Sequence, residues 1–169
     1  MVVVTTPRLL LRRLEDRDAG FLVELLNDPA FIRFIADRGV RTDQDAREYL
    51  SNGPYASYAR YGFGLCCVCL RDSGVPIGIC GFLKRADLDD ADIGFALLPR
   101  YCARGYAFEV ASALLRDARA LFALTRVLAI TNPDNASSIK LLDRLGFSCD
   151  KRISVPWSSQ ELLLFSCAV

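Results

Sequence analysis

The chain of 169 residues is 52% hydrophobic and 24% charged, which fits one folded domain with its own core and argues against a disordered segment. Lys and Arg number 21 against 20 Asp and Glu, so the net charge of +1 lacks the basic excess of a general nucleic-acid-binding protein. Histidine is absent, which excludes Ser-His-Asp and Cys-His catalysis and every histidine-ligated metal site.

No segment of the chain predicts a membrane span or a secretion signal. The uncharged apolar stretches are shorter than the roughly 18 residues that suggest a transmembrane helix. Residues 1–4 are too few for the apolar region of a signal peptide. The seven cysteines are an odd number, so we expect no disulfide framework. The expectation is a soluble cytoplasmic protein that binds neither a membrane nor nucleic acid.

The N-terminal part of the chain predicts one strand followed by three helices. Residues 8–14 fit a strand, and Asp16 is placed to cap a helix whose apolar positions recur on one face. Asp28-Pro29 has the form of a second helix start, with proline at the first helical position. Residues 42–45 resemble a capping box that opens a third helix, and Gly53-Pro54 interrupts that helix.

Two apolar runs, 63–70 and 75–83, flank a polar turn and are typical of a β-hairpin. Cys66 and Cys69 lie in the first run with the C-x-x-C spacing of some zinc sites. Residues three apart on a strand face opposite sides, so the two thiols would not converge on a metal. We interpret these cysteines as small buried hydrophobic residues and expect no metal.

The C-terminal half predicts strands and helices in alternation. Apolar residues alternate at Ile93, Phe95 and Leu97, as on a half-buried strand. The elements expected after it are a long amphipathic helix over 105–124, a strand at 127–130, a helix over 135–145 ending at Gly146, and strands near 147–155 and 160–167. We predict a single domain over 1–169, an α/β fold of the α+β type with a mixed, mostly antiparallel central sheet flanked by helices.

The passage from the strand at 92–98 into the long helix predicts an anion site. A short basic turn containing Gly105 links the two, so free backbone N–H groups point at one spot near the start of the helix. The helix dipole favours a phosphate there. A second polar motif, residues 132–138, precedes the next helix. Together they indicate an enzyme that holds a phosphate-bearing acyl carrier.

Taken in order, these motifs resemble the GNAT superfamily of N-acetyltransferases. The matching segments are 6–12, 76–78, 93–95, 104–109 and 132–147. Each is weak alone, and their ordered combination over nearly the whole chain is specific. Within the superfamily, the chain is similar to the branch that contains the bacterial enzymes acetylating the N-terminus of ribosomal proteins. The resemblance implies the GNAT fold and acetyl-CoA as cosubstrate.

The resemblance also implies where acetyl-CoA would bind. The pyrophosphate would accept hydrogen bonds from the N–H groups of the turn, where small residues allow close approach. The pantetheine arm would lie along the strand before the turn, in the manner of β-augmentation. The residues implied to bind the cosubstrate are Leu97, Leu98, Ala103, Arg104, Gly105, Tyr106, Ala107, Asn132 and Asn135.

Ser138 and Asp92 are the candidate catalytic residues. Ser138 matches the family position that hydrogen-bonds the leaving sulfur, and the alternative is that it only helps to cap the helix. Asp92 lies where this branch often has glutamate, so it can accept the proton of the amine. The alternative for Asp92 is a solvated carboxylate beside other strand-end acids.

Several nearby residues carry two interpretations. Glu109 matches a frequent family residue, but the helix dipole alone favours a carboxylate there, so we interpret it as structural. Cys102 stands where the family often has a larger side chain. It could act as a nucleophile, but the chain has no histidine to activate its thiol. The basic residues that could reach the phosphates, or could be ordinary surface charges, are Arg100, Arg104, Lys140 and Arg144.

The resemblance implies direct transfer to a primary amine in a ternary complex. The acceptor is a protein N-terminus or a small molecule such as an aminoglycoside, a polyamine or an amino acid. Trp157 lies in the loop on the expected acceptor side, and Tyr55, Tyr58 and Tyr61 either line an acceptor groove or pack in the core. A non-catalytic module that binds CoA and regulates a partner is the alternative from another class. A monomer or a homodimer fits the chain.

Overall fold

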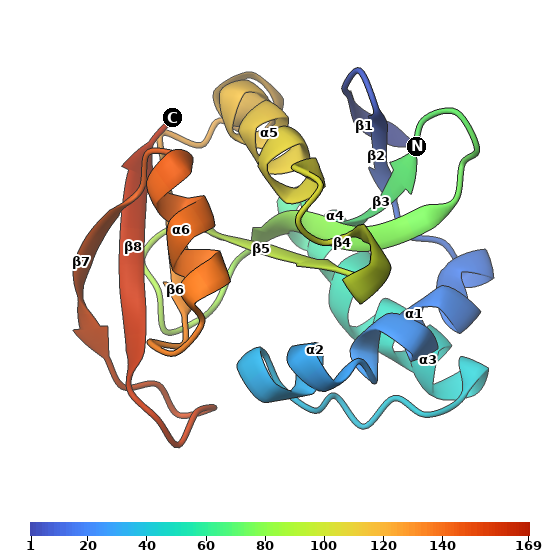
Figure 1. The fold of residues 1–169 in the computed structure, drawn as a ribbon, viewed down its shortest axis with the longest axis horizontal. Coiled ribbons are helices and arrows are strands. Elements are labelled where there is room, and N and C mark those ends of the chain that lie inside the picture. The colour runs from blue at the N-terminus through green and yellow to red at the C-terminus, as the bar shows by residue number, and fades with distance from the viewer.

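The computed structural model describes residues 1–169 and places eight strands in one sheet, in the order β1-β2-β3-β4-β5-β6-β8-β7 (Figure 1). Neighbouring strands are antiparallel except for β5 and β6, which are parallel. The strands are β1 (Val2–Thr5), β2 (Leu9–Arg13), β3 (Leu65–Leu70), β4 (Pro76–Leu83), β5 (Asp92–Leu97), β6 (Arg126–Thr131), β7 (Ser148–Ile153) and β8 (Leu162–Ala168). The predicted mixed, mostly antiparallel sheet is confirmed.

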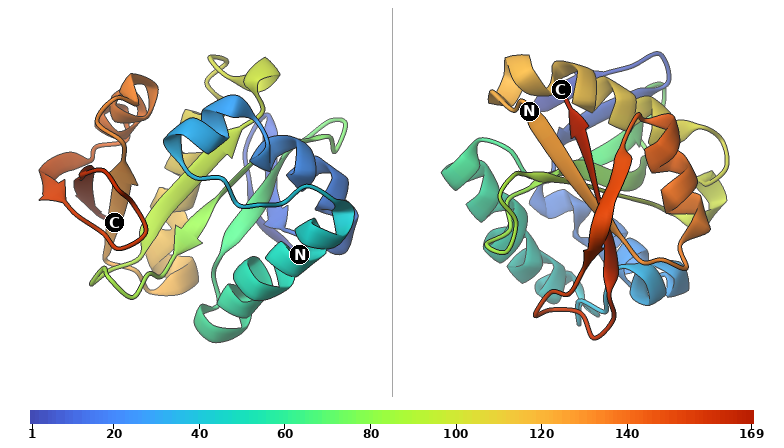
Figure 2. Two further views of the ribbon diagram at one scale, coloured as in Figure 1. Left: turned by 90° about the horizontal axis from the view of Figure 1, so that it is seen from below. Right: turned by 90° about the vertical axis from the view of Figure 1, so that its left-hand side faces the viewer.

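Helices cover both faces of this sheet (Figures 1 and 2). The helix α5 lies on one face, α1 to α4 gather on the other, and α6 lies beside β6 and β8. Two large apolar cores result, one around Leu114 of α5 and one around Leu22 of α1, beside a small third cluster of Leu88, Leu128 and Leu164. The helices are α1 (Ala19–Leu26), α2 (Pro29–Phe34), α3 (Asp43–Leu50), α4 (Ala56–Tyr61), α5 (Tyr106–Phe122) and α6 (Ala136–Arg144).

The sheet opens between β5 and β6. These two strands share a single paired position, Asp92 with Leu128, and diverge beyond it. On the other side of β5, the pairing with β4 runs from Asp92 to Leu97. Hydrogen bonds along an antiparallel pair alternate, and the Leu98 N–H donates to Ile77 on the β4 side. The N–H of Leu97 therefore points away from β4, into the opening.

The helical segment that carries the tyrosines departs from the expected break. Gly53-Pro54 does end the α-helical hydrogen bonding of α3, but the chain continues through a wide π-helical turn, Ser51–Tyr55, directly into α4. The wide turn accommodates a proline, which has no N–H to donate. Tyr58 of α4 packs in the core, and its hydroxyl donates to the Leu65 carbonyl and accepts from the Leu14 N–H at 3.1 Å. Packing is thus the role of Tyr58.

Two other predictions near the N-terminus need correction. Asp16 does not cap α1: it begins a short 3-10 turn, Asp16–Asp18, and the capping box joins Glu15 to Asp18. The strand β1 was not expected, because a four-residue edge strand is too short to show alternation. It pairs with β2 and extends the sheet by one strand.

The buried cysteines behave as the strand geometry requires. Cys66 belongs to the core under α5 and Cys69 to the core under α1 to α4, so their thiols face opposite sides of β3. No three His, Cys, Asp or Glu side chains meet in an arrangement that could hold a metal ion. None of the helices has the length and apolar character needed to cross a membrane.

Candidate functional site

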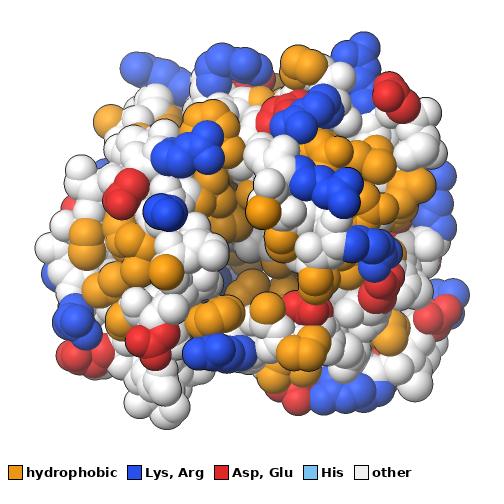
Figure 3. Space-filling view, in the orientation of Figure 1, with side chains coloured by type: hydrophobic (Ala, Val, Ile, Leu, Met, Phe, Trp, Pro, Cys, Tyr) orange, Lys and Arg blue, Asp and Glu red, His pale blue; other side chains and the backbone are white.

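A groove of about 450 Å³ lies where β5 ends, the turn before α5 begins and α6 passes alongside. The space-filling view shows a hollow with an apolar floor at the middle of this face (Figure 3). The groove brings together most of the residues predicted to bind the cosubstrate, and one predicted catalytic residue. These are Leu97, Ala103, Gly105, Tyr106, Ala107, Asn135 and Ser138.

The turn before α5 has the backbone form that an anion site requires. Ala103 and Gly105 have positive φ angles, 59° and 80°, so the chain curls twice before the helix begins. None of the N–H groups of residues 103–108 donates to an acceptor within the protein. These donors lie at the start of a helix of 17 residues, whose dipole adds positive potential. The turn can therefore bind a phosphate through its backbone.

Glu109 fixes this turn to the N-terminal part of the chain. Its carboxylate accepts from the Thr6 hydroxyl at 2.6 Å, from the Arg8 N–H at 3.0 Å and from Arg8 Nε at 2.6 Å. Arg8 also donates to the Arg104 carbonyl at 3.1 Å, and its guanidinium lies 4.6 Å from the Tyr106 ring centroid. These contacts agree with a structural role for Glu109: it holds the turn in place from outside the groove.

The wall opposite the turn is α6. Asn135 caps this helix, because its Oδ1 accepts from the Ser138 N–H at 3.2 Å. Gly146, with a φ of +88°, follows the last turn of the helix, as predicted. The Ser138 hydroxyl lines the groove and makes no hydrogen bond within the protein. The cap is thus supplied by the Asn135 side chain, and the Ser138 hydroxyl is free to contact a ligand.

Of the four basic residues considered as ligands for the phosphates, two line the groove and two do not. Lys140 and Arg144 line the groove, and the Arg144 guanidinium lies 4.3 Å from the Phe108 ring centroid. Arg100 instead forms an ion pair with Glu24 at 2.5 Å, and Arg104 lies outside the groove lining. No Asp or Glu lines the groove, so its walls suit an anionic ligand.

Asp92 lies at the closed end of the opening, where β5 and β6 still pair. Its side chain is 2% exposed, and Arg85 Nε donates to both carboxylate oxygens, at 2.9 and 3.1 Å. Burial raises the pKa of the Asp92 carboxyl, and the charge of Arg85 opposes this only in part. The alternative of a solvated surface carboxylate is wrong for Asp92, because the strand pairing and Arg85 enclose it.

Besides Arg104, two of the predicted cosubstrate residues, Leu98 and Asn132, lie apart from the groove. The Leu98 side chain is buried in the core under α1 to α4, and its N–H donates to the Ile77 carbonyl at 2.8 Å. Asn132 forms a turn: its Oδ1 accepts from the Asp134 N–H at 2.9 Å and its Nδ2 donates to Gln160 at 3.0 Å. The side chains of both residues therefore have structural partners instead of facing the groove.

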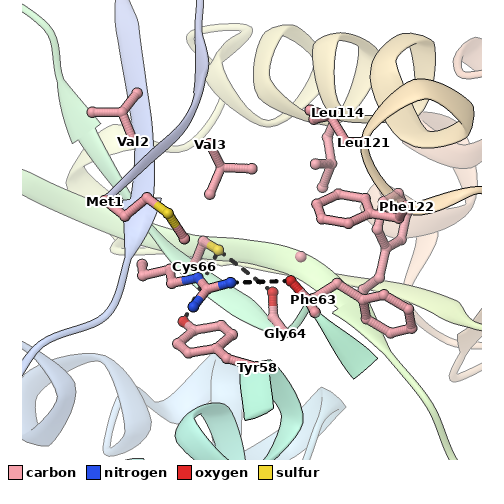
Figure 4. Close-up of a pocket in the computed structure, with 14 residues that line it drawn as sticks. Met1, Val2, Val3, Tyr58, Phe63, Gly64, Cys66, Leu114, Leu121 and Phe122 are labelled. Atoms are coloured by element: carbon pink, nitrogen blue, oxygen red, sulfur yellow. Dashed lines mark hydrogen bonds between the residues drawn. The ribbon is translucent and has the colours of Figure 1, made fainter. Parts of the chain in front are cut away.

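A second, apolar pocket of about 160 Å³ lies on the α5 face, between β1, α4 and the end of α5. Met1, Phe63 and Phe122 line it from three segments far apart in the chain (Figure 4). Its one charged lining residue, Arg13, donates to the Gly62 carbonyl at 3.2 Å. Of the residues singled out in the sequence only Tyr58 lines it, and Tyr58 packs in the core, so we do not assign the pocket to the reaction.

The comparisons with known proteins agree with this geometry. Residues 8–148 match the family model described as an acetyltransferase (GNAT) domain. An uncharacterized N-acetyltransferase of Bacillus subtilis, YnaD, is 29% identical over 85% of this chain and 81% of its own. The fold matches a GNAT-family acetyltransferase from Bacillus anthracis, with a TM-score of 0.81 and 23% identity over 99% of this chain and 98% of that one.

A further structural match is RimL, a ribosomal L7/L12 alpha-N-protein acetyltransferase in complex with coenzyme A. Its TM-score is 0.83 at 14% identity, over 100% of this chain and 98% of that one. At this identity the likeness shows the fold alone. The family model covers most of the chain, and the relative from Bacillus subtilis is likewise named an N-acetyltransferase. This chain therefore belongs to the GNAT family of acetyltransferases.

Proposed function

We propose that the protein transfers an acetyl group from acetyl-CoA directly to a primary amine, with a protein N-terminus as the leading acceptor. The observation that carries the proposal is the groove between β5 and α6. It joins unused N–H donors at the start of α5, an unpaired edge of β5 and the free hydroxyl of Ser138. A thioester that binds through a phosphate and an extended amide chain fits this sequence of contacts.

The residues of the groove fit acetyl-CoA from its phosphates to its pantetheine arm. The N–H groups of residues 103–108 would bind the pyrophosphate, with Lys140 and Arg144 as neighbouring cations. The Leu97 backbone would pair with the pantetheine arm, and Asn135 would bind its amide. When bound, acetyl-CoA supplies an acetyl group already activated as a thioester. The protein then has mainly to align the amine with it.

Two side chains would manage the protons. The Ser138 hydroxyl donates a hydrogen bond to the sulfur that leaves, because it has no competing partner in the protein. The Asp92 carboxylate accepts a proton from the amine, directly or through a water. Its raised pKa brings it closer to neutral pH than an exposed aspartate, which suits a general base.

A protein N-terminus is the leading acceptor by analogy with a protein of the same fold. RimL, which shares the fold, is described as acting on the α-amine of a ribosomal protein. The family resemblance implies that the acceptor enters between the N-terminal helices and the loop 154–159. Small-molecule amines are the second candidate, since this fold hosts many acceptors.

Calorimetric titration with acetyl-CoA, with ATP and NAD as controls, tests the donor half of the proposal. We expect acetyl-CoA to bind and the two controls to fail. Thiol release is then measured with N-terminal peptides and with a panel of small amines. No binding of acetyl-CoA would refute the proposal. Binding without thiol release from any amine would instead favour the non-catalytic CoA-binding module.

A further inference from the structure

A third pocket, of about 370 Å³, lies on the opposite face of the sheet from α5, between the segment α3 to α4 and the end of β4. Four cationic side chains line it: Arg38, Arg60, Lys84 and Arg85. No Asp or Glu is among its lining residues. In a chain with almost equal numbers of acidic and basic residues, this local separation of charge needs a reason.

Most of this positive charge is not neutralised within the protein. Arg38 and Arg60 form no ion pair, and the Arg60 guanidinium only packs on the Tyr61 ring, 5.2 Å from its centroid. Lys84 Nζ donates to two backbone carbonyls, those of Leu88 and Asp89, which orient the ammonium without cancelling its charge. Arg85 alone has a carboxylate partner, Asp92. Three full charges therefore remain for a ligand.

The pocket adjoins the strand that carries the proposed base. Leu65 and Leu83 line the pocket, and a Cβ added to Gly94 of β5 would lie 2.9 Å from Leu83 Cδ1 and 3.4 Å from Leu65 Cδ2. Ala96 packs with the core under α1 to α4, so the alternation of side chains turns Asp92 toward the same face. Arg85 completes the connection, because it lines the pocket and binds Asp92.

We propose that this pocket binds an oxyanion of the acceptor, so that the preferred substrate is an amine that also carries a carboxylate or a phosphate. This inference rests on the proposed acetyl transfer. Arginine forms paired hydrogen bonds with planar oxyanions, and the guanidinium groups of Arg38 and Arg60 are available for them. An oxyanion held there would place the acceptor beside Gly94 and Asp92. A polycationic acceptor would meet like charges instead.

Matched acceptors that differ only in the oxyanion test the inference. We would compare a peptide beginning Ser-Asp-Asp with one beginning Ser-Asn-Asn, alanine with alaninamide, and phosphoethanolamine with ethanolamine. We expect kcat/KM to be about tenfold or more higher for the anionic member of at least one pair, since a charge-assisted hydrogen bond is lost in the neutral one. The pair that responds identifies the source of the oxyanion: an acidic N-terminus, a free carboxylate or a phosphate.

Variants of the pocket locate the effect. The preference is the kcat/KM for the anionic acceptor divided by that for its neutral partner. In the double variant Arg38→Gln/Arg60→Gln this ratio should fall toward one. Arg47→Gln removes an exposed charge from α3 outside the pocket and should keep the ratio. Equal rates for both members of every pair, or a ratio that survives the double variant, would overturn the inference while leaving acetyl transfer intact. Absence of transfer to any amine would overturn the proposed function as well.

Discussion

Arg85 Nε lies 2.9 Å from Asp92 Oδ1, and the same guanidinium lies 4.7 Å from the ring centroid of Trp157. One arginine thus connects the buried carboxylate of β5 with the exposed tryptophan of the loop between β7 and β8. The two residues were singled out separately in the sequence, Asp92 as the base and Trp157 as an acceptor-side residue. Their shared contact gives a physical reason to test them as one region.

Replacing Asp92 by Asn should remove one ionisation from the dependence of rate on pH. A base works only when ionised, and burial raises the pKa of this carboxyl, so activity should rise as the pH increases through that raised pKa. Asp92→Asn should lower kcat by about 100-fold or more and lose this limb of the profile. The measurement is kcat/KM against pH. Asp89→Asn, a nearby exposed carboxylate, is the control, and an unchanged profile for Asp92→Asn would contradict the assignment.

Ser138→Ala should separate turnover from binding. The hydrogen bond from the hydroxyl would strengthen as negative charge develops on the leaving sulfur, so we expect kcat to fall by about tenfold to 100-fold, in line with one lost hydrogen bond. The Kd for acetyl-CoA, measured by calorimetry, should change by less than about threefold. Because Asn135 caps α6 through the Ser138 backbone, thermal stability should stay constant. Equal acetyl transfer by the variant would remove Ser138 from the reaction.

Gly105→Val should abolish binding of acetyl-CoA. A side chain at this position meets a φ of +80° and would bring Cβ within 3.3 Å of Arg8 Nη2, at the turn that exposes the N–H donors. Gly74→Val is the matched control: its φ is +70°, but no atom lies within 4 Å of the added Cβ and the position is in the hairpin turn. Both variants carry similar backbone strain, so only loss of affinity specific to Gly105→Val supports the anion site.

Glu109→Gln should destabilise the fold in a pH-dependent manner. Burial alone would raise the pKa of Glu109, but hydrogen bonds from Thr6 and Arg8 outweigh it and hold the pKa below its usual value. A carboxylate with a lowered pKa stabilises the fold above its unfolded pKa, and this stabilisation is lost as the pH falls through the folded pKa. We expect urea unfolding to show a loss of about 1 to 3 kcal/mol at pH 7 that shrinks in acid. A loss independent of pH would argue against the ionised contact.

The local parts of the site could be predicted because their signals lie within a few residues. The cap at Asn135, the glycine after α6 and the strand–turn–helix around Gly105 each depend on neighbouring residues alone. The resemblance to a known family then joined these motifs into one groove. The N-terminal tie of Glu109 to Arg8 spans 101 residues, and no local pattern contains such a contact.

The sequence alone could not predict which charged side chains are buried, or which side chains from separate segments come together. In the sequence, Asp92 lies near three other acidic residues, and the pattern fits a solvated carboxylate as well as it fits a catalytic base. Only the folding of Arg85 over it, seven residues earlier in the chain, encloses it. The cationic pocket was missed for the same reason, because Arg38, Arg60 and Lys84 come from separate segments and each is ordinary alone.

The single paired position between β5 and β6 has a consequence for cohesion of the domain. The backbone hydrogen bonding between neighbouring strands is continuous from β1 to β5, is nearly absent between β5 and β6, and resumes among β6, β8 and β7. Because of this gap, α6 and the last three strands form a lobe that few main-chain hydrogen bonds join to the rest of the domain. A ligand lying along β5 would act as the missing strand between the lobes. The cosubstrate would then be part of the architecture, and amide hydrogens on both sides of the opening would exchange more slowly once it binds.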